Sequence, residues 1–258
     1  GYSTAGYWQS KLPGAALFSA IPFGPEAGEY MAWLYYGNGL KLYQEMYDQA
    51  GYNVHVLPCA MLSPETSGWF NKEINSPDDL KGLNMRFFGL GARVMQKMGV
   101  STQLLAGADI YPALEKGVID ATVIPWEVTG ALKVPELVHN HTTFGDDTLY
   151  TTTFIFAMNQ QKWDALPDDL KAVIDANSGL EFSAFAGRQM QADDAPSHEM
   201  ALDMGNNVIT LTPEQVAEWK AAAASVSDDW VAEMDGKGLD GSGLRTRAAE
   251  LIAKHTAK

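Results

Sequence analysis

The sequence contains a single cysteine, Cys59, among 258 residues. One cysteine excludes an internal disulfide and a thiolate metal cluster. Basic residues are also scarce, with 18 Lys and Arg against 32 Asp and Glu and a formal net charge of −14. This balance argues against nucleic acid as a partner. No apolar run approaches the roughly eighteen residues of a membrane span, so we expect no direct membrane insertion.

Motifs of enzymes are missing as well. The sequence has no Gly-x-Ser-x-Gly elbow, no His-Glu-x-x-His helix and no Walker loop, which favours a protein that is not an enzyme. His139 and His141 lie in a polar stretch typical of a surface loop, and we expect no metal site there. The turn Gly89-Leu90-Gly91 follows a strand as in a dinucleotide fingerprint, although Val94 replaces the third glycine. An NAD(P)-dependent oxidoreductase is therefore the alternative of a different functional class.

The residues that are present predict a compact α/β protein, since 46% are hydrophobic and 19% charged. Helical patterns alternate with short strands, which indicates α/β layers around a mostly parallel sheet. Strands are predicted at residues 54–57, 83–88, 118–124, 152–158 and 208–211. Helices are predicted at 30–49, 91–98, 109–116, from about 166 to 205 as one long kinked helix, and from 212 onward.

Arg86 is the most informative residue. It lies between Met85 and Phe87 on a short apolar strand, where a solvated charge is not expected. Its planar guanidinium suits a carboxylate held by two parallel hydrogen bonds. An arginine that pairs with an internal acid is an equally good interpretation of the same pattern. Phe88, at the end of the same strand, is a candidate for the apolar wall beside it.

Two further candidates follow from turns. Glu65, in the turn Pro64 to Phe70, is either an acid that starts a helix or a carboxylate that faces a ligand. Trp126 follows Pro125 at the end of a strand, the place where α/β proteins locate binding loops. We expect its indole to stack on a ligand, with packing in the core as the alternative.

With these motifs assembled, the chain resembles the substrate-binding subunits of tripartite ATP-independent periplasmic (TRAP) transporters, the DctP family, in its branch that binds 2-oxo acids. The likeness covers nearly the whole chain. It is carried by Gly-Trp-Phe-x-Lys-Glu-Ile (68–74), Asp-Leu-Lys-Gly-Leu-x-Met-Arg (79–86), Asp-Ile-Tyr-Pro-Ala-Leu-Glu-Lys-Gly-Val-Ile-Asp-Ala (109–121) and Trp-Asp-Ala-Leu-Pro (163–167).

The resemblance implies a two-lobed α/β fold of the periplasmic binding protein kind, with crossing strands and a long helix that bridges the lobes. It implies a partial lobe 1 at residues 1–63, without the family's N-terminal βαβ unit, and lobe 2 at 64–151. Residues 152–195 form the return to lobe 1 and the bridging helix, and 196–258 form C-terminal helices that pack mainly on lobe 2.

The resemblance also implies a periplasmic protein that delivers a small organic acid to membrane permease subunits. Arg86 matches the arginine that pairs with the ligand carboxylate, Tyr7 and Trp8 match aromatic residues of the lobe 1 wall, and Thr152 matches a polar contact. The family's glutamate and tryptophan, which hold a cation together with a glutamine, are Val123 and Ile124 here. Glu65 takes the glutamine's place, so a bound cation at Glu65 is one expectation and no cofactor is the other.

Arg86 alone decides the expected ligand. One buried arginine matches one carboxylate, because a second unpaired charge is costly in a low-dielectric site. The sequence therefore predicts a monocarboxylate with a 2-oxo or hydroxyl group, with a small sulfonate or an aromatic carboxylate as alternatives.

Overall fold

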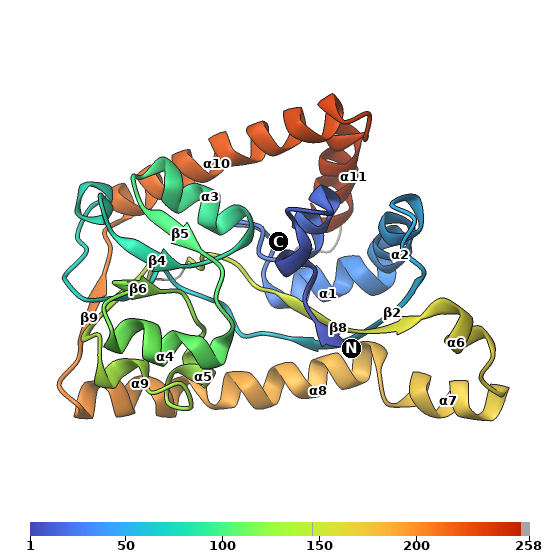
Figure 1. The fold of residues 1–258 in the computed structure, drawn as a ribbon, viewed down its shortest axis with the longest axis horizontal. Coiled ribbons are helices and arrows are strands. Elements are labelled where there is room, and N and C mark those ends of the chain that lie inside the picture. The colour runs from blue at the N-terminus through green and yellow to red at the C-terminus, as the bar shows by residue number, and fades with distance from the viewer. Residues whose placement is uncertain (146, 254–258) are drawn as a thin grey trace.

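The structure, a computed structural model, describes residues 1–145 and 147–253. The chain forms two lobes, each built on its own β-sheet, which lie at opposite ends of the long axis (Figure 1). Residues 254–258, the last part of the predicted C-terminal segment, lie outside the described residues.

Lobe 1 contains a three-stranded sheet in the order β1-β8-β2. Its pairings are antiparallel, which differs from the mostly parallel sheet expected. The reason is topological: the chain leaves the lobe through β2 and returns beside it through β8. Its elements are β1 (Tyr2–Ser3), β2 (Val54–Met61), β8 (Thr153–Asn159), the 3₁₀ helices η1 (Ala5–Trp8) and η2 (Pro13–Phe18), and α1 (Ala27–Tyr36), α2 (Gly39–Gln49), α6 (Gln160–Asp164) and α7 (Asp168–Ala176).

Lobe 2 contains a mixed sheet in the order β5-β4-β6-β3-β7-β9. Parallel pairs join β4 to β5 and β6, and β7 to β9, while β3 runs antiparallel to both neighbours. The strands are β3 (Gly68–Phe70), β4 (Asn84–Arg86), β5 (Ser101–Gln103), β6 (Ala121–Thr122), β7 (Asn140–Thr143) and β9 (Asn207–Thr210). The helices are η3 (Pro77–Leu80), α3 (Gly89–Lys97), α4 (Gly107–Glu115), α5 (Trp126–Thr129), η4 (Val134–Glu136) and α9 (Asp194–Asp203).

Two segments, residues 62–65 and 149–152, connect the lobes, and residues 19–23 of lobe 1 lie beside the second of them. The central segment, 149–152, bonds to both others through its backbone. Ala20 N donates to Thr151 O at 3.3 Å on one side, and Leu62 N donates to Thr152 O at 2.9 Å on the other. These hydrogen bonds fix the segments as one ribbon between the two sheets.

Helices also bridge the lobes along two edges of the molecule (Figure 1). The predicted long helix is three helices instead, α7, α8 (Gly179–Ala192) and α9. The first break falls at Gly179, whose φ of 75° is left-handed backbone that suits glycine, and the second at Asp193. Along the opposite edge runs α10 (Pro213–Gly236), followed by α11 (Gly241–Ala253), which packs against α1 of lobe 1. The C-terminal helices thus contact both lobes, with α10 on α3 of lobe 2 and α11 on α1 of lobe 1.

The predicted helix 30–49 is likewise two helices. Gly37 and Asn38 separate them, and Asn38 has a left-handed φ of 61°. The turn brings Gly39 so close to Trp33 that a Cβ at Gly39 would lie 2.9 Å from the indole. Because a side chain there would clash, the break is set by packing as much as by local propensity.

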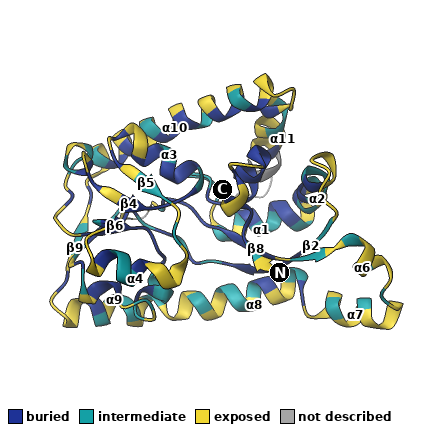
Figure 2. Cartoon of the chain, in the orientation of Figure 1, coloured by how far each residue is buried: buried dark blue, intermediate teal, exposed yellow. Residues whose placement is uncertain are grey.

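Buried residues form two hydrophobic clusters. The larger one runs from lobe 1, where Phe18 stacks between Trp33 and Tyr43, into lobe 2, where it includes Met85, Phe87 and Tyr150. A smaller cluster around Trp69, Ile110 and Ile124 lies in lobe 2 alone, where α4, α5 and α9 are found. In Figure 2 buried residues appear in dark blue, and helices α8 and α10 carry many exposed residues.

Candidate functional site

Arg86 ends β4, the strand between β5 and β6, and only 6% of its surface is exposed. Its Nε donates to Leu105 O at 3.2 Å, and its Nη1 donates to Val123 O at 2.9 Å. Two backbone carbonyls therefore fix the plane of the guanidinium. No carboxylate of the described residues lies within 4 Å of it, so the internal ion pair considered above is not found there.

Glu65 lies on the connecting ribbon and is 4% exposed. Its backbone pairs with that of Tyr150, and the Tyr150 hydroxyl donates to Glu65 Oε2 at 2.9 Å. Burial raises the pKa of Glu65 to about 8, although this hydrogen bond and the charge of Arg86 act in the opposite direction. Glu65 thus keeps its proton at neutral pH, and it leaves the charge of Arg86 uncompensated.

Aromatic rings from both lobes meet beside Arg86. The Arg86 Cζ atom lies 5.4 Å from the centre of the Phe88 ring, and Tyr7 of η1 meets the same ring edge-on at 4.8 Å. Gly6 allows this approach, because a Cβ there would lie 2.8 Å from Phe88. We name Arg86, Glu65, Tyr150, Phe88 and Tyr7 the Arg86 cluster.

Trp8 and Thr152 lie near this cluster in different settings. Trp8 is 49% exposed, and its recorded ring contact is with Lys11, whose Nζ lies 5.8 Å from the ring centre. Thr152 is buried in the connecting ribbon. Its hydroxyl lies 3.4 Å from that of Ser19, which in turn bonds to Thr4 at 2.8 Å. The structure therefore gives Thr152 a place in the ribbon between the lobes.

Trp126 begins α5 and is half-buried. Its ring packs against Trp69 at 5.5 Å, His141 at 4.2 Å and His198 at 5.0 Å between ring centres. All three aromatic contacts recorded for it in the described part of the chain are therefore on the side of the smaller core cluster. This placement favours the alternative of core packing, and ligand stacking by Trp126 stays a prediction.

His141 corrects the expectation of a surface loop. It lies on β7 and is buried, with Nε2 at 2.6 Å from the Thr66 hydroxyl. The flanking residues are polar, but the strand runs inside the sheet, so the pattern was misleading. Burial lowers the pKa of His141 to about 3, which keeps the ring neutral. Among the residues described, no group of three or more His, Cys, Asp or Glu side chains is arranged to hold a metal ion.

A carboxyl pair that sequence reasoning missed lies where α5 meets α9. The Ser63 hydroxyl lies 2.5 Å from Glu127 Oε2 and 3.1 Å from Asp194 Oδ1. Burial is the main cause that raises the pKa of Glu127 to about 7, and it raises the pKa of Asp194 as well. Glu127 and Asp194 are 64 and 131 positions away from Ser63 along the chain, and no local motif reveals contacts over such separations.

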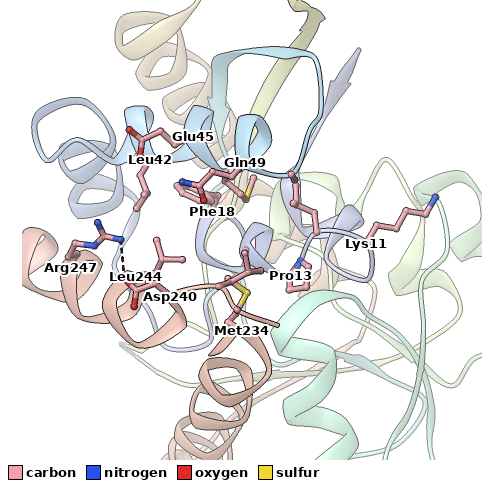
Figure 3. Close-up of a pocket in the computed structure, with 16 residues that line it drawn as sticks. Lys11, Pro13, Phe18, Leu42, Glu45, Gln49, Met234, Asp240, Leu244 and Arg247 are labelled. Atoms are coloured by element: carbon pink, nitrogen blue, oxygen red, sulfur yellow. Dashed lines mark ion pairs between the residues drawn. The ribbon is translucent and has the colours of Figure 1, made fainter. Parts of the chain in front are cut away.

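A cavity of about 530 Å³ lies elsewhere, between η2, α2 and the turn from α10 to α11 (Figure 3). Its charged lining includes Arg247 and Asp240, which pair at 3.7 Å. Glu45, also in the lining, pairs with Lys41 at 3.8 Å. None of the residues that line it belongs to the Arg86 cluster. Because Arg247, Asp240 and Glu45 are already paired, and the remaining charged residue of the lining, Lys11, lies over the Trp8 ring, we place the candidate site at Arg86 and not in this cavity.

Comparisons with known proteins agree with the resemblance. The model of the family described as "Bacterial extracellular solute-binding protein, family 7" (DctP) matches residues 1–233. The monocarboxylate 2-oxoacid-binding periplasmic protein all3028 of Nostoc is 45% identical over 121 residues, which are 47% of this chain and 33% of that protein. The chain thus spans about a third of the length of this curated relative.

Two solved structures share the fold over nearly the whole chain. A TRAP solute-binding protein of Rhodoferax ferrireducens, in complex with copurified benzoate, has a TM-score of 0.86 and 33% identity, covering 98% of this chain and 78% of that one. One from Bordetella bronchiseptica, with copurified calcium and picolinate in its active site, has a TM-score of 0.89 and 25% identity, covering 98% and 73%.

These findings confirm the family, the two-lobed α/β fold and the periplasmic localisation that were predicted. They also confirm the prediction that the protein is not an enzyme, so the oxidoreductase alternative is wrong. In the structure, Gly91 packs against Phe87, where a Cβ would lie 2.3 Å from the ring. The fingerprint-like turn therefore has a role in packing. None of the described helices is long and apolar enough to cross a membrane.

Proposed function

Because this chain belongs to family 7 of the bacterial extracellular solute-binding proteins, we propose that it captures a small organic acid between its lobes and delivers it to the permease subunits of a TRAP transporter. The connecting ribbon places Arg86 and Phe88 of lobe 2 opposite Tyr7 of lobe 1. A ligand that contacts both lobes favours the closed state by its difference in affinity for the closed and open states.

The observation that supports this proposal most strongly is the state of Arg86. Its guanidinium is buried, fixed by two carbonyl oxygens, and has no carboxylate within 4 Å among the described residues. A buried charge without a counter-ion is costly, so a ligand carboxylate is the natural partner. The Nη2 atom has no recorded partner in the described part of the chain and is available for it.

The ligand that we propose is a monocarboxylate with a 2-oxo or hydroxyl group. A second carboxylate would need a second cation, and the nearest candidates on α3 are already paired across to α10. Arg93 bonds to Glu233 at 2.8 Å, and Lys97 bonds to Asp229 at 2.7 Å. The name of the Nostoc relative, which binds monocarboxylate 2-oxo acids, supports the same class.

Aromatic carboxylates, and small sulfonates of similar shape, are the second candidate class. The rings of Phe88 and Tyr7 offer faces and edges to an aromatic ligand, and Trp8 exposes half of its surface nearby in the sequence. The Rhodoferax relative was found with benzoate, which favours this class. Thr152 and Trp126 complete the proposed set of contacts, as a polar group on the ribbon and as a ring at the end of β6.

A cation is held by the Bordetella relative together with its ligand. The side chains of this chain at the candidate site do not fit a cation. Glu65 accepts a hydrogen bond from the Tyr150 hydroxyl at one oxygen, retains its own proton at neutral pH, and lies within the field of Arg86. Val123 and Ile124 offer no side-chain oxygen. We therefore propose that this chain binds its ligand without a metal ion.

Thermal-shift measurements with a panel of acids test these proposals. We expect pyruvate, 2-oxobutyrate, lactate or benzoate to raise the melting temperature, and succinate and NAD to leave it unchanged. The shift is expected to be the same in EDTA and in millimolar calcium. Native mass spectrometry of the purified protein identifies any acid that remains bound. Stabilisation by dicarboxylates alone contradicts the ligand class, and a shift that EDTA abolishes contradicts binding without a metal.

A further inference from the structure

The side-chain amide of Gln9 is buried, and its N–H₂ group has no hydrogen-bond acceptor among the described residues. Gln9 follows η1 in lobe 1 and is 6% exposed. Its Nε2 is fully buried and, within the part of the chain that is described, has no hydrogen-bond partner. An amide N–H₂ group deprived of water and of protein acceptors is unfavourable, and a ligand acceptor is one way to complete it.

The position of Gln9 links it to the Arg86 cluster. Its Oε1 lies 3.3 Å from the place that a Cβ would take at Gly89, the first residue of α3 and the third after Arg86. Gly89 has a left-handed φ of 68°, so the backbone itself favours glycine and leaves room for the amide. Gln9 thus extends from lobe 1 to the same end of β4 at which Arg86 and Phe88 lie.

The backbone around Gln9 is held in place before any ligand arrives. Gln9 N donates to Gly6 O at 3.4 Å, and Leu12 N donates to Trp8 O at 2.8 Å. Gly6 in turn lies directly against the side chains of Ser19 and Phe88, with no room for a Cβ between them. The amide is therefore presented by a short, ordered segment, and binding need not order it.

We propose that Gln9 is the second ligand-binding group of this site and determines its specificity: its Nε2 donates a hydrogen bond to an acceptor on carbon 2 of the acid whose carboxylate Arg86 holds. This inference rests on the proposed function. The acceptor is a 2-oxo oxygen, a 2-hydroxyl oxygen or a ring nitrogen next to the carboxylate. A neutral amide suits an uncharged acceptor, whereas Arg86 takes the charge.

The two residues belong to different lobes, and this has a consequence for closure. An acid with an acceptor on carbon 2 bonds to Arg86 of lobe 2 and to Gln9 of lobe 1 at once. An acid without it bonds to Arg86 only. The first kind of acid therefore stabilises the closed state more than the second, and Gln9 converts a small chemical difference into a difference in affinity.

Matched pairs of ligands test the role of Gln9. We measure 2-oxobutyrate against butyrate, and picolinate against benzoate, by titration calorimetry on the 258-residue chain. The wild type is expected to favour the acid with the acceptor by about tenfold in each pair that binds, the value of one buried hydrogen bond. Equal affinities within a pair overturn the assignment of Gln9 without the use of any variant.

Gln9→Met keeps the length of the side chain and removes the donor. We expect the two acids of each pair to bind within about twofold of each other. The affinity for the acid with the acceptor drops about tenfold more than the affinity for the acid without it. Gln9→Asn keeps the donor one methylene short and is expected to retain part of the preference. Gln49→Met, the same substitution at an exposed residue of α2, is expected to retain all of it.

Arg86→Lys separates this inference from the proposed function. It is expected to weaken both acids of a pair by the same factor, since both present a carboxylate. If Gln9→Met keeps the wild-type preference while Arg86→Lys weakens both acids, the role of Gln9 is refuted and the proposed function stands. If the wild type binds none of the four acids, both are refuted.

Discussion

The Tyr150 hydroxyl donates a hydrogen bond to Glu65 across the connecting ribbon, at 2.9 Å. The ring of Tyr150 stacks on that of Phe87, with 5.7 Å between the ring centres. Tyr150 and Glu65 also pair through their backbones, so one contact ties a titratable group to the ribbon that joins the lobes. Both side chains are buried, and burial raises the pKa of each above its ordinary value. Protonation of Glu65 is therefore linked to the stability of this ribbon.

Glu65→Gln is expected to change how stability depends on pH. The folded pKa of Glu65, about 8, is above its ordinary value of 4.5, so the folded state binds the proton more tightly than the unfolded state. The stabilisation is complete below pH 4.5 and is lost as pH rises to 8, by up to about 1.4 kcal/mol per pH unit. Gln cannot ionise, so the variant becomes more stable than the wild type across this window.

Urea unfolding at pH values from 5 to 9 measures this difference. The comparison with wild type is needed because His141, whose folded pKa is about 3, contributes the opposite slope below pH 6.5. Glu45→Gln, at a half-exposed residue paired with Lys41, is the matched control and is expected to show no such trend. Parallel pH curves for wild type and Glu65→Gln would show that Glu65 ionises normally.

Arg86→Lys is expected to weaken binding of the preferred acid by about 2 kcal/mol, or roughly thirtyfold. An ammonium group does not reproduce the planar arrangement that bonds to Leu105, Val123 and a ligand together. Titration calorimetry gives the affinity. Arg93→Lys, on α3 and paired with Glu233, keeps charge in the same way and is expected to leave the affinity unchanged. An affinity within twofold of wild type for Arg86→Lys assigns Arg86 a structural role.

The sequence predicted the part of the site that depends on neighbours along the chain. Met85 and Phe87 indicated correctly that Arg86 is buried, and the short strand around it was expected. That Arg86 has no acidic partner among the described residues was not predictable, because this depends on every acid that the fold brings near. Glu65 and Tyr150 are 85 residues apart, and their hydrogen bond has no local signal.

The limits of the fold prediction have the same origin. Strands β3, β5 and β6 have two or three residues each, too few for an alternating pattern, and their pairing with neighbours defines them. The break between α1 and α2 was missed because the tyrosines on both sides keep a helical spacing through Gly37 and Asn38. The two lobes followed from the family resemblance, which contains long-range information that periodicity lacks.

Trp126→Ala is expected to lower the free energy of unfolding by about 2 kcal/mol. The ring contacts Trp69, His141 and His198, so its removal leaves a gap beside the smaller core cluster. Denaturant unfolding measures this loss, and calorimetry at a temperature where the variant is fully folded measures affinity. A loss of both identifies Trp126 as a ligand contact that also supports the core. A loss of stability with wild-type affinity removes it from the ligand site.

The last prediction concerns Glu127, whose side chain shares a short hydrogen-bond network with Ser63 and Asp194. The Ser63 hydroxyl has one proton for two carboxyl groups, so one of the two acids must remain protonated to avoid repulsion between them. Glu127 Oε1 is buried and has no partner in the described residues, which adds to the cost of ionising it. The folded pKa of Glu127 is about 7, above the ordinary 4.5.

Stability supplied by this network is therefore complete below pH 4.5 and is lost as pH rises to about 7. Glu127→Gln is expected to match the wild type below pH 4.5 and to exceed its stability increasingly up to pH 7 and above, because the amide stays neutral. Glu136→Gln on the surface is the control, since Glu136 pairs loosely with Lys133 at 4.0 Å. Ser63→Ala removes the shared hydroxyl and is expected to cost about 1 kcal/mol at pH 5. If Glu127→Gln is less stable than the wild type at pH 8, the folded protein does not bind the Glu127 proton more tightly than the unfolded chain does, and the two carboxyl groups do not share a proton.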